Sequence, residues 1–375
     1  MLNKTAHAAE YSQRSWRQKM TSKSYISRWH DPHNTLGSQS VNLVAGDIGG
    51  TWSRLAWFSQ AWQQPRRIAF EHVYRSDAFT DAIHLLRTFF VDAAQSGLPE
   101  RICLALPGPV DEQRAALTNL DWIVDAQQIA TELGLAEVCF VNDFQAAAAG
   151  VESLGRADLR VLIPGVPRLG ATLVITGAGT GLGVAWMQSD ERGNWQVFAS
   201  EGGHADFAPT DARQCELLHW LARRHGGHVS WERVLSGGGL SALHAFVCGR
   251  EPITDEQDID PARIHELALQ GGREAVQAIQ LFADVYAAWV GNLAVLYQPR
   301  GGLYLAGGMS IHLQDWLIAQ RFVELAIAKG RMSALVTQTP VYLVTHGRVG
   351  LLGAMHLCTS RAAALGCRPA RFSRQ

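Results

Sequence analysis

The chain has 375 residues, a formal net charge of -1 and 47% hydrophobic residues, a composition typical of a globular protein with a sizeable core. This length favours two domains, and the balanced charge gives no support for nucleic acid or a membrane surface as a partner. No apolar run approaches the ~20 residues of a membrane span. The six cysteines form no CxxC pair, which disfavours a zinc knuckle or a disulfide scaffold and fits a reducing, cytoplasmic location.

Residues 1–40 differ in composition from the rest of the chain. They are rich in Ser, Lys, Arg, His and Gln, with six basic and two acidic residues. No apolar core precedes a small-residue cleavage site, so the pattern does not indicate a secretory signal. We expect this segment to be a disordered N-terminal extension outside the folded domains.

From residue 41 onward, strand-like and helix-like stretches alternate, which predicts an α/β fold. The first half is predicted to hold a glycine-linked hairpin, a third strand, an amphipathic helix, an apolar strand, a second helix and a buried strand. Their ranges are 42–45, 53–58, 68–74, 79–94, 101–106, 125–134 and 138–141. We assign residues 41–150 to a small α/β domain.

The second half is predicted to hold another glycine hairpin, a long helical stretch, two strands and a closing helix. Their ranges are 173–176, 182–187, 261–298, 302–306, 341–344 and 351–365. We assign residues 151–345 to a large α/β domain. The C-terminal helix, within residues 346–375, is expected to pack back on the small domain and complete it.

The most informative stretch is the first hairpin, residues 44–58, which reads VAGDIGGTWSRLAWF. Glycines in its Gly-Asp-x-Gly-Gly-Thr turn let backbone N–H groups approach an anion closely. Asp47 would repel a phosphate there unless a divalent cation bridges the carboxylate and the phosphate. The turn therefore predicts a metal–nucleotide site, although a lone glycine hairpin is more often only a tight turn.

A second glycine turn follows about 130 residues later, and both hairpins exit with an Ala-Trp pair, Ala56-Trp57 and Ala185-Trp186. We interpret this as an internal repeat in which each half offers one phosphate-binding hairpin to a cleft between them. Neither turn has the lysine of a Walker loop. Strand-like residues follow both turns, which disfavours a dinucleotide fingerprint, because that motif opens a helix.

Asn142 and Asp143 follow a predicted buried strand, at the end where active sites of α/β folds usually lie. A carboxylate there could accept the proton of an attacking hydroxyl, and the Asn142 amide suits a sugar hydroxyl because it can both donate and accept. The alternative is that Asp143 only caps the helix of the following alanine-rich run.

Three further polar residues, Glu201, His204 and Glu232, lie beside glycines. Carboxylates and imidazoles bind polyols well, because they accept from or donate to neighbouring hydroxyls. The alternatives are a structural or metal-bound His204 and a solvent-facing Glu232, and no cysteine cluster supports a zinc site. Three glycines at 237–239 indicate a loop that approaches a ligand.

In this order, the motifs resemble those of the bacterial hexose kinase family of the glucokinase type, within the actin-like ATPase superfamily. The resemblance spans roughly residues 41–360 and rests on VAGDIGGT, TNLDW, VNDF, TGAGTGLG, EGGHADFAP, SWERVLSG and LYLAGGM. It implies an actin-like (ribonuclease H-like) α/β fold, with two lobes around a nucleotide and sugar cleft. Gly238 departs from the family, which commonly has proline there, and the cysteine-rich zinc motif of the repressor/kinase branch is missing.

By position, the resemblance implies ATP-dependent phosphorylation of D-glucose at its 6-hydroxyl, with Asp143 as the general base. The residues it implies for the sugar are Asn142, Asp143, Glu201, His204 and Glu232. Those it implies for the nucleotide are Gly46, Asp47, Ile48, Gly49, Gly50, Thr51, Gly177, Gly179, Thr180, Gly307 and Gly308. It also implies Mg²⁺ near Asp47, bound through water, and a homodimer.

Two other functions stay open at this point. One is a kinase that acts on another hexose or uses another phosphate donor, such as polyphosphate. The other is a sugar-sensing regulator without useful turnover. The presence of Asp47 and Asp143 disfavours the regulator, and the N-terminal extension shows no helix-turn-helix pattern.

Overall fold

A computed structural model describes residues 40–61, 64–111, 113–117, 120–191, 193, 195–252 and 258–359. The predicted N-terminal extension and the end of the predicted C-terminal helix lie outside these ranges. So do Thr118 and Asn119, the first two residues of the TNLDW motif.

The first half of the described chain builds a mixed sheet of five strands in the order β3-β2-β1-β4-β7. The strands β1, β2 and β3 are antiparallel neighbours, whereas β1, β4 and β7 are parallel. Their bounds are Val41–Ile48 (β1), Trp52–Gln60 (β2), Arg67–Arg75 (β3), Arg101–Leu106 (β4) and Val138–Asn142 (β7). A separate short hairpin joins Arg114–Ala116 (β5) and Ile123–Asp125 (β6).

The second half builds another mixed sheet, in the order β11-β10-β9-β12-β13-β8. The bounds are Leu159–Ile163 (β8), Leu173–Ala178 (β9), Leu182–Ser189 (β10), Trp195–Ser200 (β11), Gly302–Ala306 (β12) and Val341–Val344 (β13). Here β9, β10 and β11 are antiparallel neighbours, and β9, β12 and β13 are parallel. Apart from the added β8, this arrangement repeats that of the first sheet.

The strand register strengthens the predicted internal repeat. Ala56 pairs with Ala45 and Trp57 with Val44 in the first hairpin. In the second hairpin, Ala185 pairs with Ile175 and Trp186 with Val174. The Ala-Trp pairs therefore occupy equivalent positions in the two sheets.

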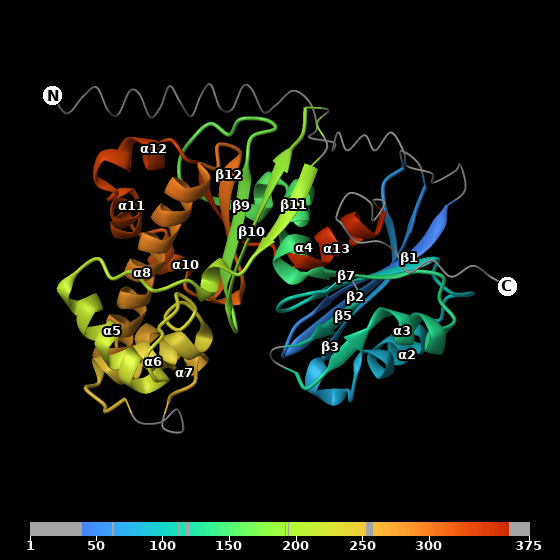
Figure 1. Ribbon diagram of the computed structural model, residues 1–375, viewed down its shortest axis with the longest axis horizontal. Coiled ribbons are helices and arrows are strands. Elements are labelled where there is room, and N and C mark those ends of the chain that lie inside the picture. Colours follow the sequence, from blue (N-terminus) through green and yellow to red (C-terminus); the bar gives the residue numbers. More distant parts are fainter. Residues whose placement is uncertain are drawn as a thin grey trace. The chain divides into compact units, whose positions relative to one another are not determined.

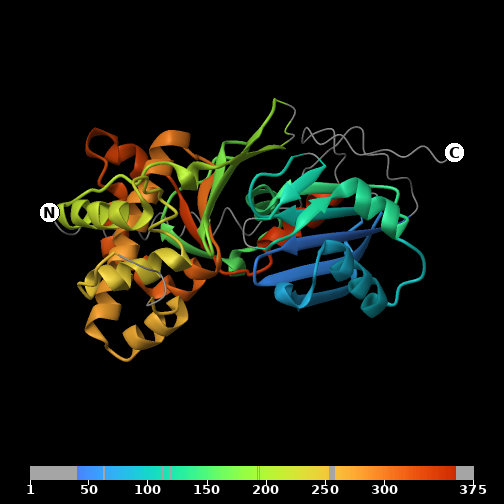
Figure 2. The same ribbon diagram turned by 60° about the horizontal axis from the view of Figure 1, so that its bottom comes forward.

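Helices cover both faces of the first sheet (Figure 1). One face packs its apolar side chains against α2 (Ala82–Ala93) and α3 (Ala126–Leu133). The other face packs against α4 (Asp143–Gly150) and α13 (Val349–Thr359), and the same core includes side chains of β9, β10, β12 and β13. The paired helices α4 and α13 thus lie between the two sheets, as the turned view in Figure 2 also shows.

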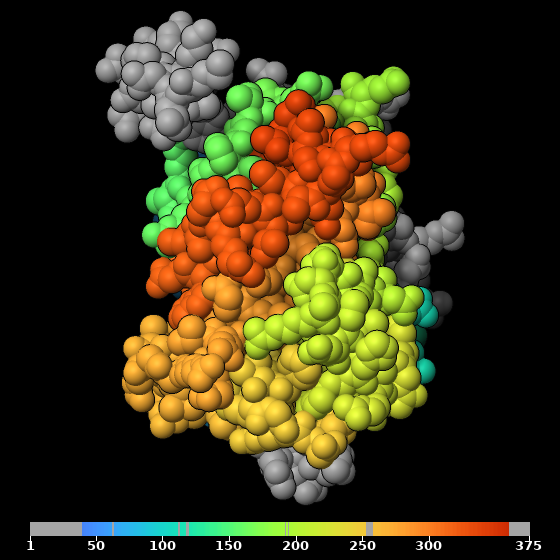
Figure 3. Space-filling view, turned by 90° about the vertical axis from the view of Figure 1, so that its left-hand side faces the viewer, coloured from blue at the N-terminus to red at the C-terminus, as the bar shows by residue number. Residues whose placement is uncertain are grey.

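The far face of the second sheet packs against a helical layer. Figure 3 shows the outer surface of this layer, coloured yellow-green to red. Its main helices are α5 (Ala212–His225), α6 (Gly237–Val247), α7 (Pro261–Leu269), α8 (Arg273–Tyr297) and α11 (Gln320–Ile327). Shorter helices are α9 (Gly308–His312), α10 (Gln314–Leu317) and α12 (Ser333–Thr337). The largest buried cluster of the described residues lies between these helices and the sheet. The domain boundaries at residues 150 and 345 stay a prediction.

The predicted elements agree with the structure wherever local signals are strong. Asp125 accepts a hydrogen bond from the Gln128 N–H and so caps α3, which Gly134 ends with a φ of +67°. Helix α2 begins at Ala82 rather than at residue 79, because Asp81 caps it through the His84 N–H. The helical stretch predicted over 261–298 is confirmed, but it forms two helices, because α7 and α8 are separated at Gly271, whose φ is +84°.

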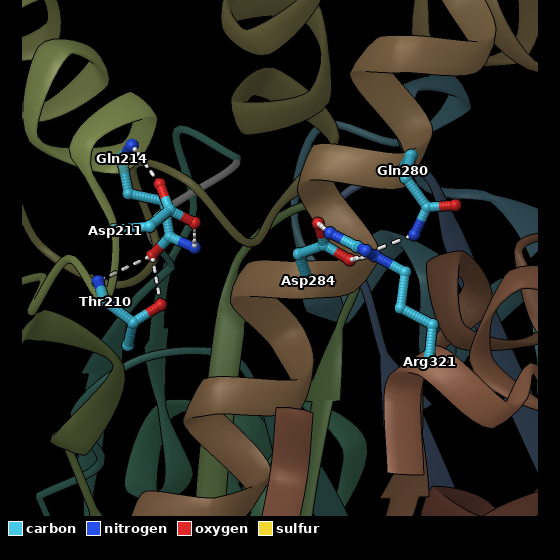
Figure 4. Close-up of polar contacts among 6 residues, drawn as sticks. All are labelled: Thr210, Asp211, Gln214, Gln280, Asp284 and Arg321. Carbon is cyan, nitrogen blue, oxygen red and sulfur yellow. Dashed lines mark hydrogen bonds and ion pairs between the residues drawn. The ribbon is translucent and has the colours of Figure 1, made fainter. Parts of the chain in front are cut away.

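By length and composition, α8 could cross a membrane, but 78% of its apolar window is buried inside the protein, as in the core helix of a soluble protein. It also carries a buried carboxylate, Asp284. Arg321 of α11 donates two hydrogen bonds to Asp284, at 2.8 and 2.7 Å, and Gln280 donates a third at 3.0 Å (Figure 4). This ion pair links α8 to α11. Figure 4 also shows a separate network at the start of α5, in which Asp211 accepts from the Gln214 N–H and Gln214 accepts from the Thr210 N–H.

Candidate active site

The first glycine turn closes the β1–β2 hairpin, with the Gly49 N–H donating to the Trp52 carbonyl at 3.0 Å. A buried hydroxyl supports the turn from behind, because Ser76 Oγ donates to the Gly49 carbonyl at 2.7 Å. Ser53 Oγ lies 2.8 Å from Ser76 Oγ. Asp47 pairs across the strands with Arg54, so the two side chains lie on the same face of the sheet.

The second glycine turn closes the β9–β10 hairpin, with the Gly179 N–H donating to the Gly181 carbonyl at 2.8 Å. Two contacts from elsewhere hold it. The Gly237 N–H donates to the Gly179 carbonyl at 2.8 Å, and Glu232 Oε2 accepts from the Leu182 N–H at 2.8 Å. A Cβ atom at Gly181 would lie 2.4 Å from that carboxylate oxygen, so the close contact requires glycine.

Asn142 ends β7 and caps α4. Its Oδ1 accepts from the N–H groups of Phe144 and Gln145, and its Nδ2 donates to the Gly108 carbonyl at 3.0 Å. The alternative that Asp143 caps this helix is therefore wrong, because Asn142 is the N-cap and Asp143 is the first residue of α4; its Oδ1 accepts from the adjacent Phe144 N–H at 2.8 Å.

Carboxylates from both halves of the chain influence one another around Asp143. Burial, the charge of Asp47 and, to a smaller extent, the charge of Glu201 together raise the pKa of Asp143 to about 7, and the hydrogen bond from the Phe144 N–H partly opposes them. Burial also raises the pKa of Asp47 to about 6, which the Arg54 guanidinium partly opposes. The site thus brings three carboxyl groups close enough for the charges of Asp47 and Glu201 to raise the pKa of Asp143.

The sugar candidates Glu201 and His204 flank a short 3₁₀ turn, Gly202–His204. Both side chains are exposed, and His204 Nε2 lies 3.7 Å from Glu201 Oε2. The Glu232 N–H donates to the Gly203 carbonyl at 2.9 Å. Glu232 therefore joins this turn to the second glycine hairpin, and the interpretation of Glu232 as a merely solvent-facing residue is wrong.

The remaining glycines pack closely around the second hairpin. A Cβ atom at Gly177 would lie 2.4 Å from the Ala306 carbonyl oxygen, and one at Gly307 would lie 2.4 Å from that of Ala178. Gly307 also needs its φ of +88°, and Gly308 faces open space. The loop predicted at residues 237–239 is instead the first turn of α6, capped by Ser236.

The residues around Asp47 fit a hard divalent cation. Asp47 offers carboxylate oxygens, which Mg²⁺ prefers, and the mutual repulsion of Asp47 and Asp143 would fall in the presence of positive charge. No group of three His, Cys, Asp or Glu side chains that could hold a metal occurs within the described ranges, so nothing there supports a metal-bound His204.

Arg54 was not predicted as a site residue, although the hairpin register alone places it opposite Asp47. Gly350 was also missed. It lies at the start of α13, and a Cβ atom there would lie 2.5 Å from Asp47 Oδ2. No local signal in the sequence indicates this contact, because the two residues are far apart along the chain.

Comparisons with known proteins agree with these motifs. A family model described as Glucokinase matches residues 44–361. The glucokinase of Nostoc sp. (strain PCC 7120) is 38% identical over 341 residues, which cover 85% of this chain and 99% of that protein.

Solved structures show the same similarity. A crystal structure of glucokinase from an Antarctic psychrotroph has a TM-score of 0.73 and 30% identity, covering 85% of this chain and 99% of that one. A ROK family glucokinase from Streptomyces griseus, in complex with glucose and AMPPNP, has a TM-score of 0.58 and 22% identity, covering 84% and 99%. The second similarity concerns the fold alone. The predicted α/β, actin-like fold is confirmed, and the chain belongs to the glucokinase family.

Proposed function

We propose that the protein transfers the γ-phosphoryl group of ATP to the 6-hydroxyl of D-glucose and releases glucose 6-phosphate and ADP. The observation that most supports this proposal is Asp143 at the start of α4, with a pKa raised to about 7. A general base works best when its pKa lies near the working pH, because it must be ionised and still attract a proton.

In this proposal the two hairpins hold the nucleotide. Backbone N–H groups in glycine turns can surround phosphate oxygens without obstruction by side chains. The residues that bind phosphates and adenosine are Gly46, Asp47, Ile48, Gly49, Gly50, Thr51, Gly177, Gly179, Thr180, Gly307 and Gly308. The exposed Thr180 and the open space at Gly308 fit this role.

The sugar lies against Asn142, Asp143, Glu201, His204 and Glu232. Glu201 and His204 are exposed and free to turn toward hydroxyl groups. Asn142 already uses its Oδ1 as a helix cap, so it would offer its remaining amide N–H to the sugar. Glu232 uses Oε2 for the Leu182 N–H, which leaves Oε1 for the sugar.

Asp47 would hold Mg²⁺ through water. When bound, the metal neutralises charge on the transferred phosphoryl group and orients it. The protein itself positions the two substrates and holds the base, and such positioning supplies most of the catalysis in phosphoryl transfer.

The base role of Asp143 predicts a defined pH profile. The carboxylate must be ionised to accept the proton, so kcat/KM for glucose should fall about tenfold for each pH unit below about 7. Steady-state rates between pH 5 and 8 measure this, with saturating ATP and Mg²⁺. A flat profile over this range would contradict the assignment.

Asp143→Asn should lower kcat by roughly 10²-fold or more, while glucose binding survives. Glu132→Gln, which removes an exposed carboxylate paired with Arg87 of α2, is the matched control and should leave kcat unchanged. Since folding raises the pKa of Asp143 from 3.8 to about 7, ionisation of this group lowers the stability of the native state progressively over that pH range, and the loss is fully present at pH 8. Asp143→Asn should therefore melt at a higher temperature than the wild type at pH 8, which excludes misfolding as the cause of lost turnover.

A coupled assay of ADP release tests substrate and donor together. Glucose, mannose and fructose are compared as acceptors, with ATP and polyphosphate as donors, and glucose with ATP is expected to give the highest kcat/KM.

A homodimer and a cytoplasmic location also belong to this proposal. Sedimentation velocity of the purified protein checks the dimer, which a single species of 41.0 kDa would exclude.

A further inference from the structure

The connection between β13 and α13, residues 345–348, carries the chain from the second sheet to the first. It leaves the second sheet where the Thr345 N–H donates to the Asp158 carbonyl at 2.8 Å. Two contacts then fasten it to the first sheet. Arg54 Nη1 of β2 donates to the Gly347 carbonyl at 3.0 Å, and Arg348 forms an ion pair with Glu71 of β3. We call these two contacts the clamp.

Helix α13 begins directly after the clamp, and its second residue touches the predicted metal-binding carboxylate. A Cβ atom at Gly350 would lie 2.5 Å from Asp47 Oδ2 and 3.2 Å from Oδ1. Carbon–oxygen contacts this short are repulsive, so Asp47 can keep its position only while residue 350 has no side chain. Gly347, inside the clamp, faces open space and has no such restriction.

Packing and charge, rather than hydrogen bonds, hold the Asp47 carboxylate. It accepts no hydrogen bond from any residue in the described part of the chain. Close to it lie the Gly350 Cα, the Arg54 guanidinium, whose charge lowers the pKa of Asp47, and the Asp143 carboxyl group, which repels it. Arg54 therefore acts on Asp47 directly and, through Gly347, on the start of α13.

Glycine at position 350 also runs against helix propensity. Alanine stabilises a helix by up to about 1 kcal/mol relative to glycine. Gly350 has no positive φ that would require glycine. The contact with Asp47 is the feature of the structure that requires the missing side chain.

We propose that Gly350 is a positioning residue whose bare Cα fixes the carboxylate of Asp47 for the nucleotide-bound metal, and that the clamp holds Gly350 in place. The inference rests on the proposed function, because it assumes that Asp47 orients Mg²⁺. Positioning by outer residues commonly changes metal affinity 10- to 100-fold.

Manganese binding tests this without turnover. Free Mn²⁺ is measured by electron paramagnetic resonance, with full-length protein and a non-hydrolysable ATP analogue. Gly350→Ala should weaken Mn²⁺ binding by about 10-fold or more, and its melting temperature should equal or exceed that of the wild type. Gly347→Ala is the matched control and should bind Mn²⁺ as the wild type does, because its Cβ meets open space and its carbonyl still accepts from Arg54.

Two more variants show which part of the proposal would be wrong: the role of the clamp, the role of Gly350 or the role of Asp47. Arg348→Ala breaks the clamp at a distance from the metal and should weaken Mn²⁺ binding, though less than Gly350→Ala does; wild-type affinity in that variant would overturn the role of the clamp. Asp47→Asn should lose Mn²⁺ binding. If Asp47→Asn loses it and Gly350→Ala keeps it, the positioning role of Gly350 is wrong. If Asp47→Asn keeps it, the proposed metal role of Asp47 fails first.

Discussion

The two glycine hairpins have the same strand pairing, but different side chains form hydrogen bonds with their turns. The first joins β1 and β2, and the second joins β9 and β10. Apart from β8, each sheet continues with antiparallel and parallel neighbours in the same order. Beneath the first turn lie two buried serine hydroxyls. Near the second turn a buried threonine, Thr176, donates to the Gly183 carbonyl at 2.8 Å and accepts from Trp289 of α8 at 3.0 Å.

Their charges differ more than their backbones. The first hairpin carries Asp47 on its own strand, with Arg54 opposite. In the second hairpin the carboxylate comes from outside the hairpin, because Glu232, whose own N–H donates to the Gly203 carbonyl, accepts from the Leu182 N–H. The two halves thus share a backbone plan. In the proposed function, the first hairpin would hold the metal through Asp47, whereas the carboxylate beside the second hairpin, Glu232, would contact the sugar.

Removing one polar side chain from each hairpin should lower kcat by very different amounts, and this is the largest effect that we expect. Asp47→Asn should lower kcat by about 10³-fold, because metal-assisted charge stabilisation supplies several kcal/mol. Thr180→Ala removes one neutral hydrogen bond, worth about 1 kcal/mol, and should cost no more than about tenfold. Steady-state kinetics at varied Mg²⁺ concentration measures both. Equal losses would contradict the division of tasks.

The second hairpin should respond to Glu232 in two separable ways. Glu232→Gln keeps an oxygen for the Leu182 N–H, so KM for ATP should stay near the wild-type value while KM for glucose rises about tenfold. Glu232→Ala loses both contacts and should raise KM for ATP as well. If the two variants gave the same KM for ATP, the support of the hairpin by Glu232 would be refuted.

Local signals account for what the sequence predicted well. Glycine turns between apolar runs, the Asp125 cap and the Gly134 end need only neighbouring residues, and each agrees with the structure. The break between α7 and α8 was missed because apolar periodicity continues across Gly271. The strands β8 and β11 were also missed. They lie at the sheet edges, where exposed positions weaken the alternating pattern.

The sequence motifs predicted which residues belong to the candidate site, but they did not predict the contacts between these residues. A motif can indicate that Glu232 belongs near a sugar, yet its bond to Leu182 depends on how a distant loop packs. The same holds for Gly350 and Asp47, which come together only because α13 folds back between the sheets. Arg54 is the exception, since hairpin register places it opposite Asp47 before any tertiary structure is known.

The buried hydroxyls beside the two turns, of Ser76 and Thr176, should contribute similar amounts to the stability of the protein. Ser76→Ala removes the hydroxyl that bonds to Ser53 Oγ and to the Gly49 carbonyl. Thr176→Val removes the hydroxyl that bonds to the Trp289 indole N–H and to the Gly183 carbonyl. Each unpaired buried group costs about 1–3 kcal/mol, so both variants should lower the free energy of unfolding by similar amounts, measured by urea denaturation. The two hairpins share their backbone arrangement but not their charged groups. We therefore expect Ser76→Ala and Thr176→Val to lose similar stability, although Asp47→Asn and Thr180→Ala lose very different amounts of activity. A large stability difference between the two variants would mean that the hairpins diverged in their supports as well as in their charges.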